Sequence, residues 1–219
     1  MISIATPAHR DRIVGSLVAA FPDDPVLRHL FPDDETYPVY AAAFFGHLFD
    51  KRVHRESIWM AGDGYSAAIW EPPALIAQPA APATSEPTAP ATSEPTAPAI
   101  LEAATTAAPA ATAATAVTAV TAALPPAELA RMRAYDDAVH AALPAYPFWY
   151  LGVLGTHPDW TGRRWGHAVM AAGLRRAAED GLPAILETST PGNVEMYRRA
   201  GWQVIATVEH PLPSWIMQQ

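Results

Sequence analysis

The stretch LGVLGTHPDWTGRRWGHAVM, residues 151–170, joins an apolar run to an amphipathic segment through a short loop that contains glycine and arginine. A continuous apolar run predicts a buried, central strand, and the apolar spacing after the loop predicts a helix. The first amide N–H groups of a helix lack carbonyl partners, and the helix dipole adds partial positive charge there. The loop is therefore either an anion-binding cradle or an ordinary turn with solvated arginines.

The apolar pattern on either side of this stretch predicts further helices and strands. A Gly62-Asp63-Gly64 turn between two apolar runs predicts a hairpin, and Gly201 is placed to end a short helix. The expected strands lie near residues 2–5, 57–61, 65–71, 147–158, 182–189, 202–210 and 214–219. The expected helices lie near residues 7–21, 39–53, 125–144, 165–178 and 190–200, with a short apolar helix inside the turn-rich residues 21–38. This order predicts a mixed α/β (α+β) fold, in which helices flank one central twisted sheet.

Composition excludes several classes of function. The chain has 219 residues, a formal net charge of -8 and a sequence pI near 5.4, with no basic run, so we expect no nucleic-acid partner. It contains no cysteine, which excludes disulfides, a thiol nucleophile and a cysteine zinc site. No metal-ligand spacing is evident, so we expect no metal. No apolar run is long enough to span a bilayer, so we expect no membrane partner and a cytoplasmic protein.

Residues 75–123 differ from the rest of the chain because they are almost all alanine, proline and threonine. The octapeptide PATSEPTA occurs there twice in tandem, at residues 82–89 and 90–97. Such a segment lacks the large apolar side chains whose burial offsets ordering entropy. We expect a low-complexity insert, disordered or partly helical, inside a single domain that spans residues 1–219.

Several motifs together resemble the GNAT superfamily of N-acetyltransferases. The core resemblance is carried by residues 151–170 and by LETSTPGNVEMYRRAGW at residues 186–202. AFPDDPVLRHLFPD at residues 20–33 and VEHPLPSWIM at residues 208–217 add a likeness to the puromycin N-acetyltransferase group. The resemblance implies acetyl transfer from acetyl-CoA to a primary amine of a small molecule, such as an aminonucleoside-type or other antibiotic. It implies a monomer or a homodimer.

The resemblance also implies a cofactor site. In this superfamily one strand splays from its parallel neighbour and pairs with the pantetheine arm of acetyl-CoA, while the loop amides bind the pyrophosphate. The implied contacts are Leu154, Gly155, Thr156, Gly162, Arg163, Arg164, Trp165, Gly166, His167 and Asn193. A shifted frame, Arg163-x-x-Gly166-x-Ala168, fits the pattern Gln/Arg-x-x-Gly-x-Gly/Ala fully but moves it two residues along the helix. The alignment on Pro158 is preferred because this proline fixes the register, and it makes Thr161 and Arg164 depart from the pattern. Arg164 then replaces a glycine, and it either adds a charge contact or displaces the pyrophosphate. Asn193 is equally suited to cap a helix.

Two residues are the main catalytic candidates. The resemblance implies that Tyr197, in YRRAGW, protonates the departing CoA thiolate, and a phenol at a helix start near the sulfur suits that role. Glu187 is a carboxylate in an otherwise apolar strand, so burial would raise its pKa and suit it to accept the proton of the amine. A structural ion pair is the alternative for Glu187. His29 and His157 are weaker candidates.

The acceptor pocket is expected in the N-terminal half, where aromatic residues gather. The expected substrate-binding residues are Phe31, His29, Phe44 and Trp149, with Phe21 and Phe45 as further candidates. An aromatic cleft with an acidic edge suits an aromatic amine. Two alternatives remain: a protein or peptide N-acetyltransferase, and a non-catalytic module that binds acyl-CoA.

Overall fold

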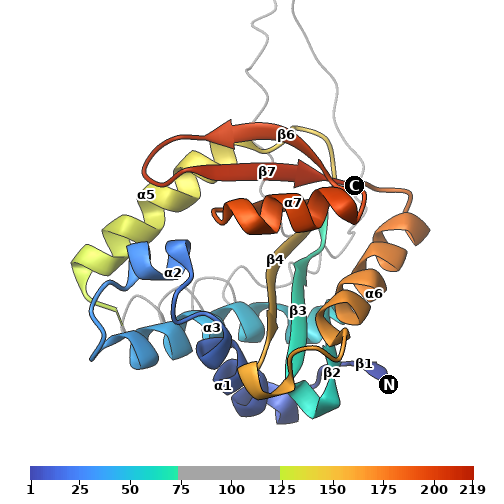
Figure 1. Ribbon diagram of the computed structural model, residues 1–219, viewed down its shortest axis with the longest axis horizontal. Helices are drawn as coiled ribbons and strands as arrows, with labels where there is room; N and C mark the ends of the chain where they lie inside the picture. Colours follow the sequence, from blue (N-terminus) through green and yellow to red (C-terminus); the bar gives the residue numbers. More distant parts are fainter. Residues whose placement is uncertain (74–123) are drawn as a thin grey trace, which may run out of the picture.

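A computed structural model of the chain describes residues 1–73 and 124–219 (Figure 1). The insert predicted for residues 75–123 lies outside the described residues. No helix within the described ranges is long and apolar enough to cross a bilayer.

One mixed sheet of seven strands organises the described residues, in the order β1-β2-β3-β4-β5-β7-β6. The strands are β1 (Ile2–Ile4), β2 (Ile58–Ala61), β3 (Ser66–Glu71), β4 (Trp149–Thr156), β5 (Ala184–Thr188), β6 (Gln203–Val208) and β7 (Ser214–Gln218). β4 and β5 are parallel, and every other neighbouring pair is antiparallel. The predicted mixed α/β fold and the central position of β4 are confirmed.

The helices follow the predicted order. They are α1 (Arg10–Ala20), α2 (Pro25–Leu30), α3 (Tyr37–Arg52), α5 (Pro126–Ala142), α6 (Trp165–Glu179) and α7 (Pro191–Arg199). The helix expected from residue 7 begins instead as a 3-10 turn, Pro7–His9, which passes into α1. The predicted hairpin is confirmed, with a 3-10 turn at Gly62–Gly64 between β2 and β3.

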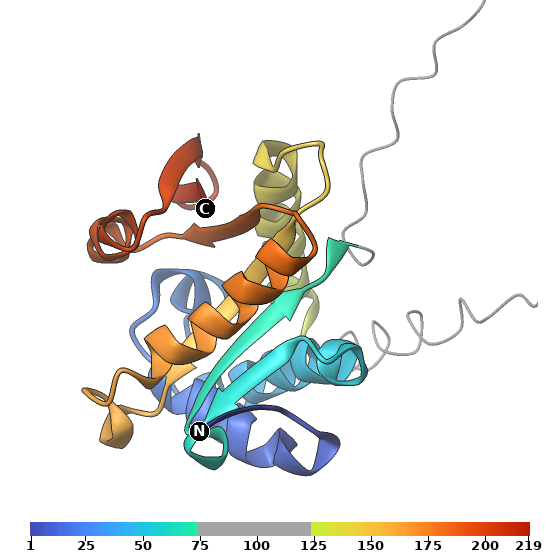
Figure 2. The same cartoon turned by 90° about the vertical axis from the view of Figure 1, so that its right-hand side faces the viewer.

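Two cores lie on opposite faces of the sheet. The first core packs α1, α2, α3 and α5 on one face, and its buried members include Ile13, Leu17, Phe45, Phe49, Ile69, Tyr135 and Ile185. The second core packs α6 and α7 on the other face, and its members include Trp59, Trp70, Trp149, Val169, Met170, Leu186 and Trp202. Figure 2 looks onto α6, which lies in front of the strands. In Figure 1, β6 and β7 lie across the ends of the upright strands β3 and β4.

Candidate active site

The parallel strands β4 and β5 separate before β4 ends, which leaves backbone groups of β4 without strand partners among the described residues. They pair in register only from Trp149 opposite Ala184 to Leu151 opposite Leu186. β4 nevertheless continues to Thr156. Among the described strands, no strand pairs with residues 152–156 on this side, so their backbone groups face the opening between β4 and β5. An extended chain with amide groups fits this opening as an added strand would.

A bulge in β4 sits at the start of this opening. Ile69 of β3 lies opposite Val153, whereas the next residue, Trp70, lies opposite Leu151, so Gly152 is the extra residue. The bulge changes which face each side chain meets. Leu151 packs in the second core, whereas Val153 packs in the first. The kink therefore turns the outer half of β4 relative to its inner half.

The loop after β4 ends in an arginine with an unusual backbone conformation. Gly162 has φ 77° and Arg164 has φ 60°, and both values lie in the left-handed region. A residue with a side chain pays about 1–2 kcal/mol in this conformation. Arg164 is the N-cap of α6, and no side chain caps this helix end. The first-turn amides are consequently left for a ligand, and the guanidinium of Arg164 is exposed, with no hydrogen bond or ion pair to the described residues.

The end of β4 and the start of α6 are in close contact. A Cβ added to Gly166, in the first turn of α6, would lie 3.3 Å from the hydroxyl oxygen of Thr156. That hydroxyl lies 2.8 Å from the hydroxyl of Ser66 on β3. The unpaired edge of β4 thus leads directly to the free amides of α6. One ligand with an extended amide arm and an anionic end fits both features.

A carboxylate lies on the wall of the same opening. Glu187 is on β5, one residue beyond the last pair with β4, and the hydroxyl of Tyr150 donates a hydrogen bond to its Oε2 atom. Burial raises the pKa of Glu187 to about 8, and the charges of Asp136 and Asp24 act in the same direction. The residue keeps some accessible surface. A carboxylate with this pKa is poised to accept a proton near neutral pH.

Residues 103–202 match the sequence model of the acetyltransferase (GNAT) family. The matched segment covers just under half of the chain and is similar to this acetyltransferase family. The fold of the chain is shared with solved structures of low identity.

Three solved structures illustrate this likeness in fold. A histone acetyltransferase HPA2-related acetyltransferase from Corynebacterium glutamicum is 18% identical with a TM-score of 0.59, over 100% of this chain and 94% of that chain. The polyamine N-acetyltransferase of Drosophila melanogaster is 13% identical with a TM-score of 0.55, over 100% and 97%. Arylalkylamine N-acetyltransferase 2 from Aedes aegypti is 8% identical with a TM-score of 0.57, over 100% and 97%. At these identities the likeness concerns the fold.

The fold brings the two main catalytic candidates, Tyr197 and Glu187, into electrostatic range of each other. Burial raises the pKa of Tyr197 to about 12, and the charge of Glu187 adds to the rise. Tyr197 is buried in the second core, with its ring 5.9 Å from that of Trp202. The expectation that Tyr197 starts a helix is wrong, because α7 begins at Pro191 and Tyr197 lies in its last turn. A phenol with this pKa keeps its proton and is available as a donor.

The hydroxyl groups of Tyr135, Ser189 and Ser214 lie near Glu187 and, together with Glu187 and Tyr150, form what we call the wall. Ser214, the first residue of β7, lies 2.6 Å from Ser189 and 3.5 Å from the phenol oxygen of Tyr135 on α5, measured between hydroxyl oxygens. Burial raises the pKa of Tyr135, and the charge of Glu187 raises it further. Neutral hydroxyl groups therefore cluster on the elements next to Glu187.

The other predicted residues are dispersed. Trp149 lies in the second core, where its ring is 6.2 Å from that of Trp59 and its N–H donates to Asp180 at 2.9 Å. It is thus on the opposite face of the sheet from Phe31 and Phe44, whose rings are 6.0 Å apart against the first core. The structure joins Phe31 and Phe44, but it does not bring Trp149 to them.

The two histidines and the asparagine have distinct surroundings. His157 Nδ1 accepts a hydrogen bond from the N–H of Asp159 at 3.3 Å, so this histidine shapes the turn. The Nε2 atom of His29 is buried without a hydrogen-bond partner among the described residues. Asn193 is not the helix cap, because that position belongs to Thr190. The amide of Asn193 lies 3.5 Å from the hydroxyl of Thr188 at the end of β5.

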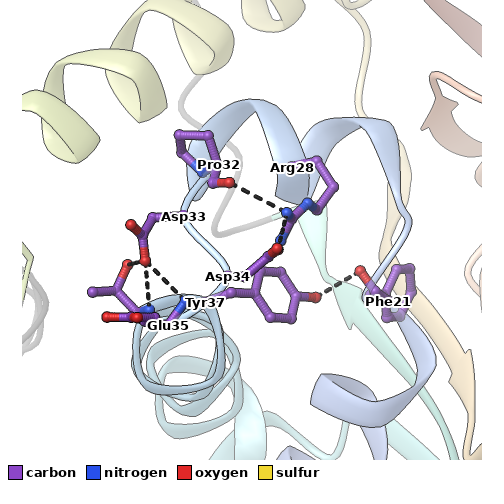
Figure 3. A network of polar contacts seen from close by, with 8 residues as sticks. Phe21, Arg28, Pro32, Asp33, Asp34, Glu35 and Tyr37 are labelled. Carbon is purple, nitrogen blue, oxygen red and sulfur yellow. Dashed lines mark hydrogen bonds and ion pairs between the residues drawn. The ribbon is translucent and has the colours of Figure 1, made fainter.

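A polar network holds the acidic turn between α2 and α3 (Figure 3). Arg28 pairs with Asp34 and donates to the carbonyl of Pro32 at 3.2 Å. The hydroxyl of Tyr37 donates to the carbonyl of Phe21 at 2.6 Å, which ties the start of α3 to the end of α1. These contacts fix the segment that carries Phe31 and its neighbours.

Sequence reasoning missed the hydroxyl groups of the acceptor side. Tyr150 has one usable signal, since it lies on the strand next to the one that carries Glu187. Tyr135, Ser189 and Ser214 carry no such signal, because a helix, a loop and the last strand bring them together. Among the described residues, no group of three or more histidine, aspartate or glutamate side chains is arranged to hold a metal ion.

Proposed function

We propose that this chain transfers the acetyl group of acetyl-CoA directly to a primary amine of a small molecule. The observation that carries the proposal is the convergence of the unpaired edge of β4, the free amides of α6 and the carboxylate of Glu187. The first two features suit the pantetheine and pyrophosphate of acetyl-CoA, and the third suits the amine. Direct transfer is favoured because the chain has no cysteine to carry the acyl group.

The described residues fit acetyl-CoA. The backbone of Leu154 to Thr156 would pair with the pantetheine arm, and the amides from Gly162 to His167 would bind the pyrophosphate. The guanidinium of Arg164 forms no ion pair with a described residue, so it would be available to bind phosphate. Acetyl-CoA would supply the thioester whose acetyl group is transferred.

The residues of the chain would handle two protons. The amine must be neutral to attack, and Glu187, directly or through a water, would accept its proton. The pKa of about 8 makes Glu187 a stronger base than an ordinary carboxylate. Tyr197 would donate a proton to the departing thiolate, since its pKa of about 12 keeps it protonated. Tyr150 would hold the carboxylate of Glu187 in place.

The acceptor is proposed to be an aromatic or nucleoside-type amine, including aminonucleoside antibiotics. Phe31, Phe44 and Phe45 form edge-to-face contacts with ring centroids 5.4–6.0 Å apart at the first core, and we propose that this cluster contributes to the acceptor pocket. Proteins with the same fold are named for arylalkylamines, polyamines and agmatine. The likeness to puromycin N-acetyltransferases favours the nucleoside class, and resistance or biosynthetic tailoring is the purpose we propose.

The proposal is tested by the release of free CoA from acetyl-CoA, measured with a thiol reagent. The panel contains puromycin-like aminonucleosides, arylalkylamines, agmatine, polyamines, aminoglycosides and short peptides. The protein has no cysteine, so its own side chains add no thiol signal. We expect turnover with aminonucleosides or arylalkylamines. Turnover with peptides alone would favour a peptide acetyltransferase, and CoA binding without turnover would favour a binding module.

A further inference from the structure

Three aromatic rings stack beside the loop that would bind the pyrophosphate. The rings of Tyr65 and Trp160 are 4.5 Å apart with an interplanar angle of 15°. The rings of Trp160 and Trp165 are 5.4 Å apart at 14°. Tyr65 follows the β2–β3 turn, Trp160 ends the 3-10 turn Pro158–Trp160, and Trp165 is the first residue of α6. The stack, defined as Tyr65, Trp160 and Trp165, therefore joins three elements.

Cations and a glycine hold the stack at both ends. The guanidinium of Arg12 on α1 lies 5.1 Å from the ring centre of Tyr65 and pairs with Asp63 at 3.2 Å. The guanidinium of Arg163 lies 4.5 Å from the ring centre of Trp160 and 5.4 Å from that of Trp165. A Cβ on Gly62 would approach Trp165 to 2.2 Å, so the indole lies directly against the turn. Cation–π and offset-stacked contacts of this kind are both attractive.

The loop from 161 to 164 is held by its ends. Trp160 and Trp165 bracket it, and the N–H of His157 donates to the carbonyl of Tyr65 at 2.8 Å just before it. The four bracketed residues are themselves exposed, and two of them have positive φ. An exposed loop in this conformation needs support from its surroundings. The hydroxyl of Thr161 donates to the carbonyl of Pro158 at 3.0 Å, and the stack supports both ends of the loop.

We infer that Tyr65, Trp160 and Trp165 are positioning residues that hold the anion-binding loop in its binding shape before the ligand arrives. The inference rests on the proposed function, because it assigns the pyrophosphate of acetyl-CoA to this loop. A loop that is already ordered loses less conformational freedom on binding, so affinity rises. The two loop arginines have different roles. Arg163 stabilises the stack through its cation–π contacts with Trp160 and Trp165, whereas Arg164 would contact the ligand.

The test is calorimetric binding of CoA to the full chain and to two variants, Trp160→Ala and Trp160→Phe. Neither substitution changes charge, so a change in affinity reports loop order rather than electrostatics. We expect Trp160→Ala to weaken CoA binding about tenfold, and Trp160→Phe to restore most of the loss, since a phenyl ring still stacks. The KM for acetyl-CoA should rise in parallel, while kcat and the KM for the amine stay within about twofold.

Two controls separate positioning from general damage. Tyr146→Ala removes another exposed ring, before β4, and should leave CoA affinity unchanged. A second control is spectroscopic. Near-ultraviolet circular dichroism should show a signal from the stacked rings of Trp160 and Trp165 in the wild type without ligand, and this signal should be lost in Trp160→Ala. A signal that develops only when CoA is added would overturn the claim that the loop is held in advance. Tyr65→Leu serves as a second variant if Trp160→Ala does not fold.

The possible failures are distinguishable. Wild-type protein that binds CoA, with Trp160→Ala binding equally well, would overturn the role of the stack alone. Wild-type protein that binds no CoA would overturn both this inference and the proposed function.

Discussion

The loop at the start of α6 and the wall around Glu187 are built in opposite ways. The loop is one continuous stretch, exposed to solvent, and carries two permanent charges, Arg163 and Arg164. The wall is assembled from α5, β4, β5 and β7, is largely buried, and carries one titratable acid among hydroxyl groups. A charged anion needs donors and fixed charge, whereas proton transfer needs an acid whose pKa burial can adjust.

This contrast has a consequence for mutation. Substitutions in the loop should change binding of the acyl donor, because in the proposed function the charges and amides of the loop bind the donor's phosphates. Substitutions in the wall should change the chemical step and its pH dependence, because Glu187 has its pKa raised to about 8 by burial.

The largest expected effect is the loss of kcat when Glu187, the acid of the wall, is substituted. Glu187→Gln keeps the size of the side chain but removes the base, so kcat should fall about 10³-fold with little change in the KM for acetyl-CoA. Steady-state kinetics at pH 8 measures it. Glu195→Gln is the matched control, since Glu195 is exposed on α7 and forms a surface ion pair with Arg198. A fall below threefold in Glu187→Gln would remove Glu187 from the mechanism.

Tyr197→Phe is the next test. Loss of the phenol proton should lower kcat about 10²-fold, while the buried ring keeps its packing against Trp202. Thermal unfolding should show that the variant stays folded, and single-turnover kinetics should place the loss in the chemical step. Unchanged turnover would leave Tyr197 as a core residue only.

Two substitutions of Arg164 test the loop. Arg164→Ala and Arg164→Gly both remove the charge, so each should raise the KM for acetyl-CoA about fivefold, with less effect at high salt. Only glycine adopts φ near 60° without strain, so Arg164→Gly should be more stable than Arg164→Ala by about 1 kcal/mol. Calorimetric melting measures the difference. A lower KM in Arg164→Gly would mean that the arginine obstructs the ligand.

The smallest expected effect is a shift in a pH profile. Glu187 must be ionised to accept a proton, so kcat/KM should rise with pH through about 8. The hydroxyl of Tyr150 donates to Glu187 and stabilises the ionised form, so its removal in Tyr150→Phe should move the midpoint upward by about 0.5 units. At pH values well above both midpoints, the kcat/KM of Tyr150→Phe should equal that of the wild type. A downward shift would contradict the donation.

Local patterns were sufficient for much of the fold. The hairpin around Gly62–Gly64, the central strand and the helix after the loop all have signals within a few residues, and each is confirmed. The bulge at Gly152 had no such signal, because it is defined by the register of β4 against β3. Trp149 was grouped with the acceptor aromatics on composition alone, and strand geometry places it on the other face.

The sequence by itself determined the order of elements and the candidate loop, because helix and strand periodicity and turn glycines act over short distances. It also excluded a cysteine-based mechanism. Only the tertiary structure decided where β4 leaves β5, which hydroxyls surround Glu187 and which rings brace the loop. Those features depend on contacts between segments far apart in the chain, and burial, which raises the pKa of Glu187, exists only once those segments pack together.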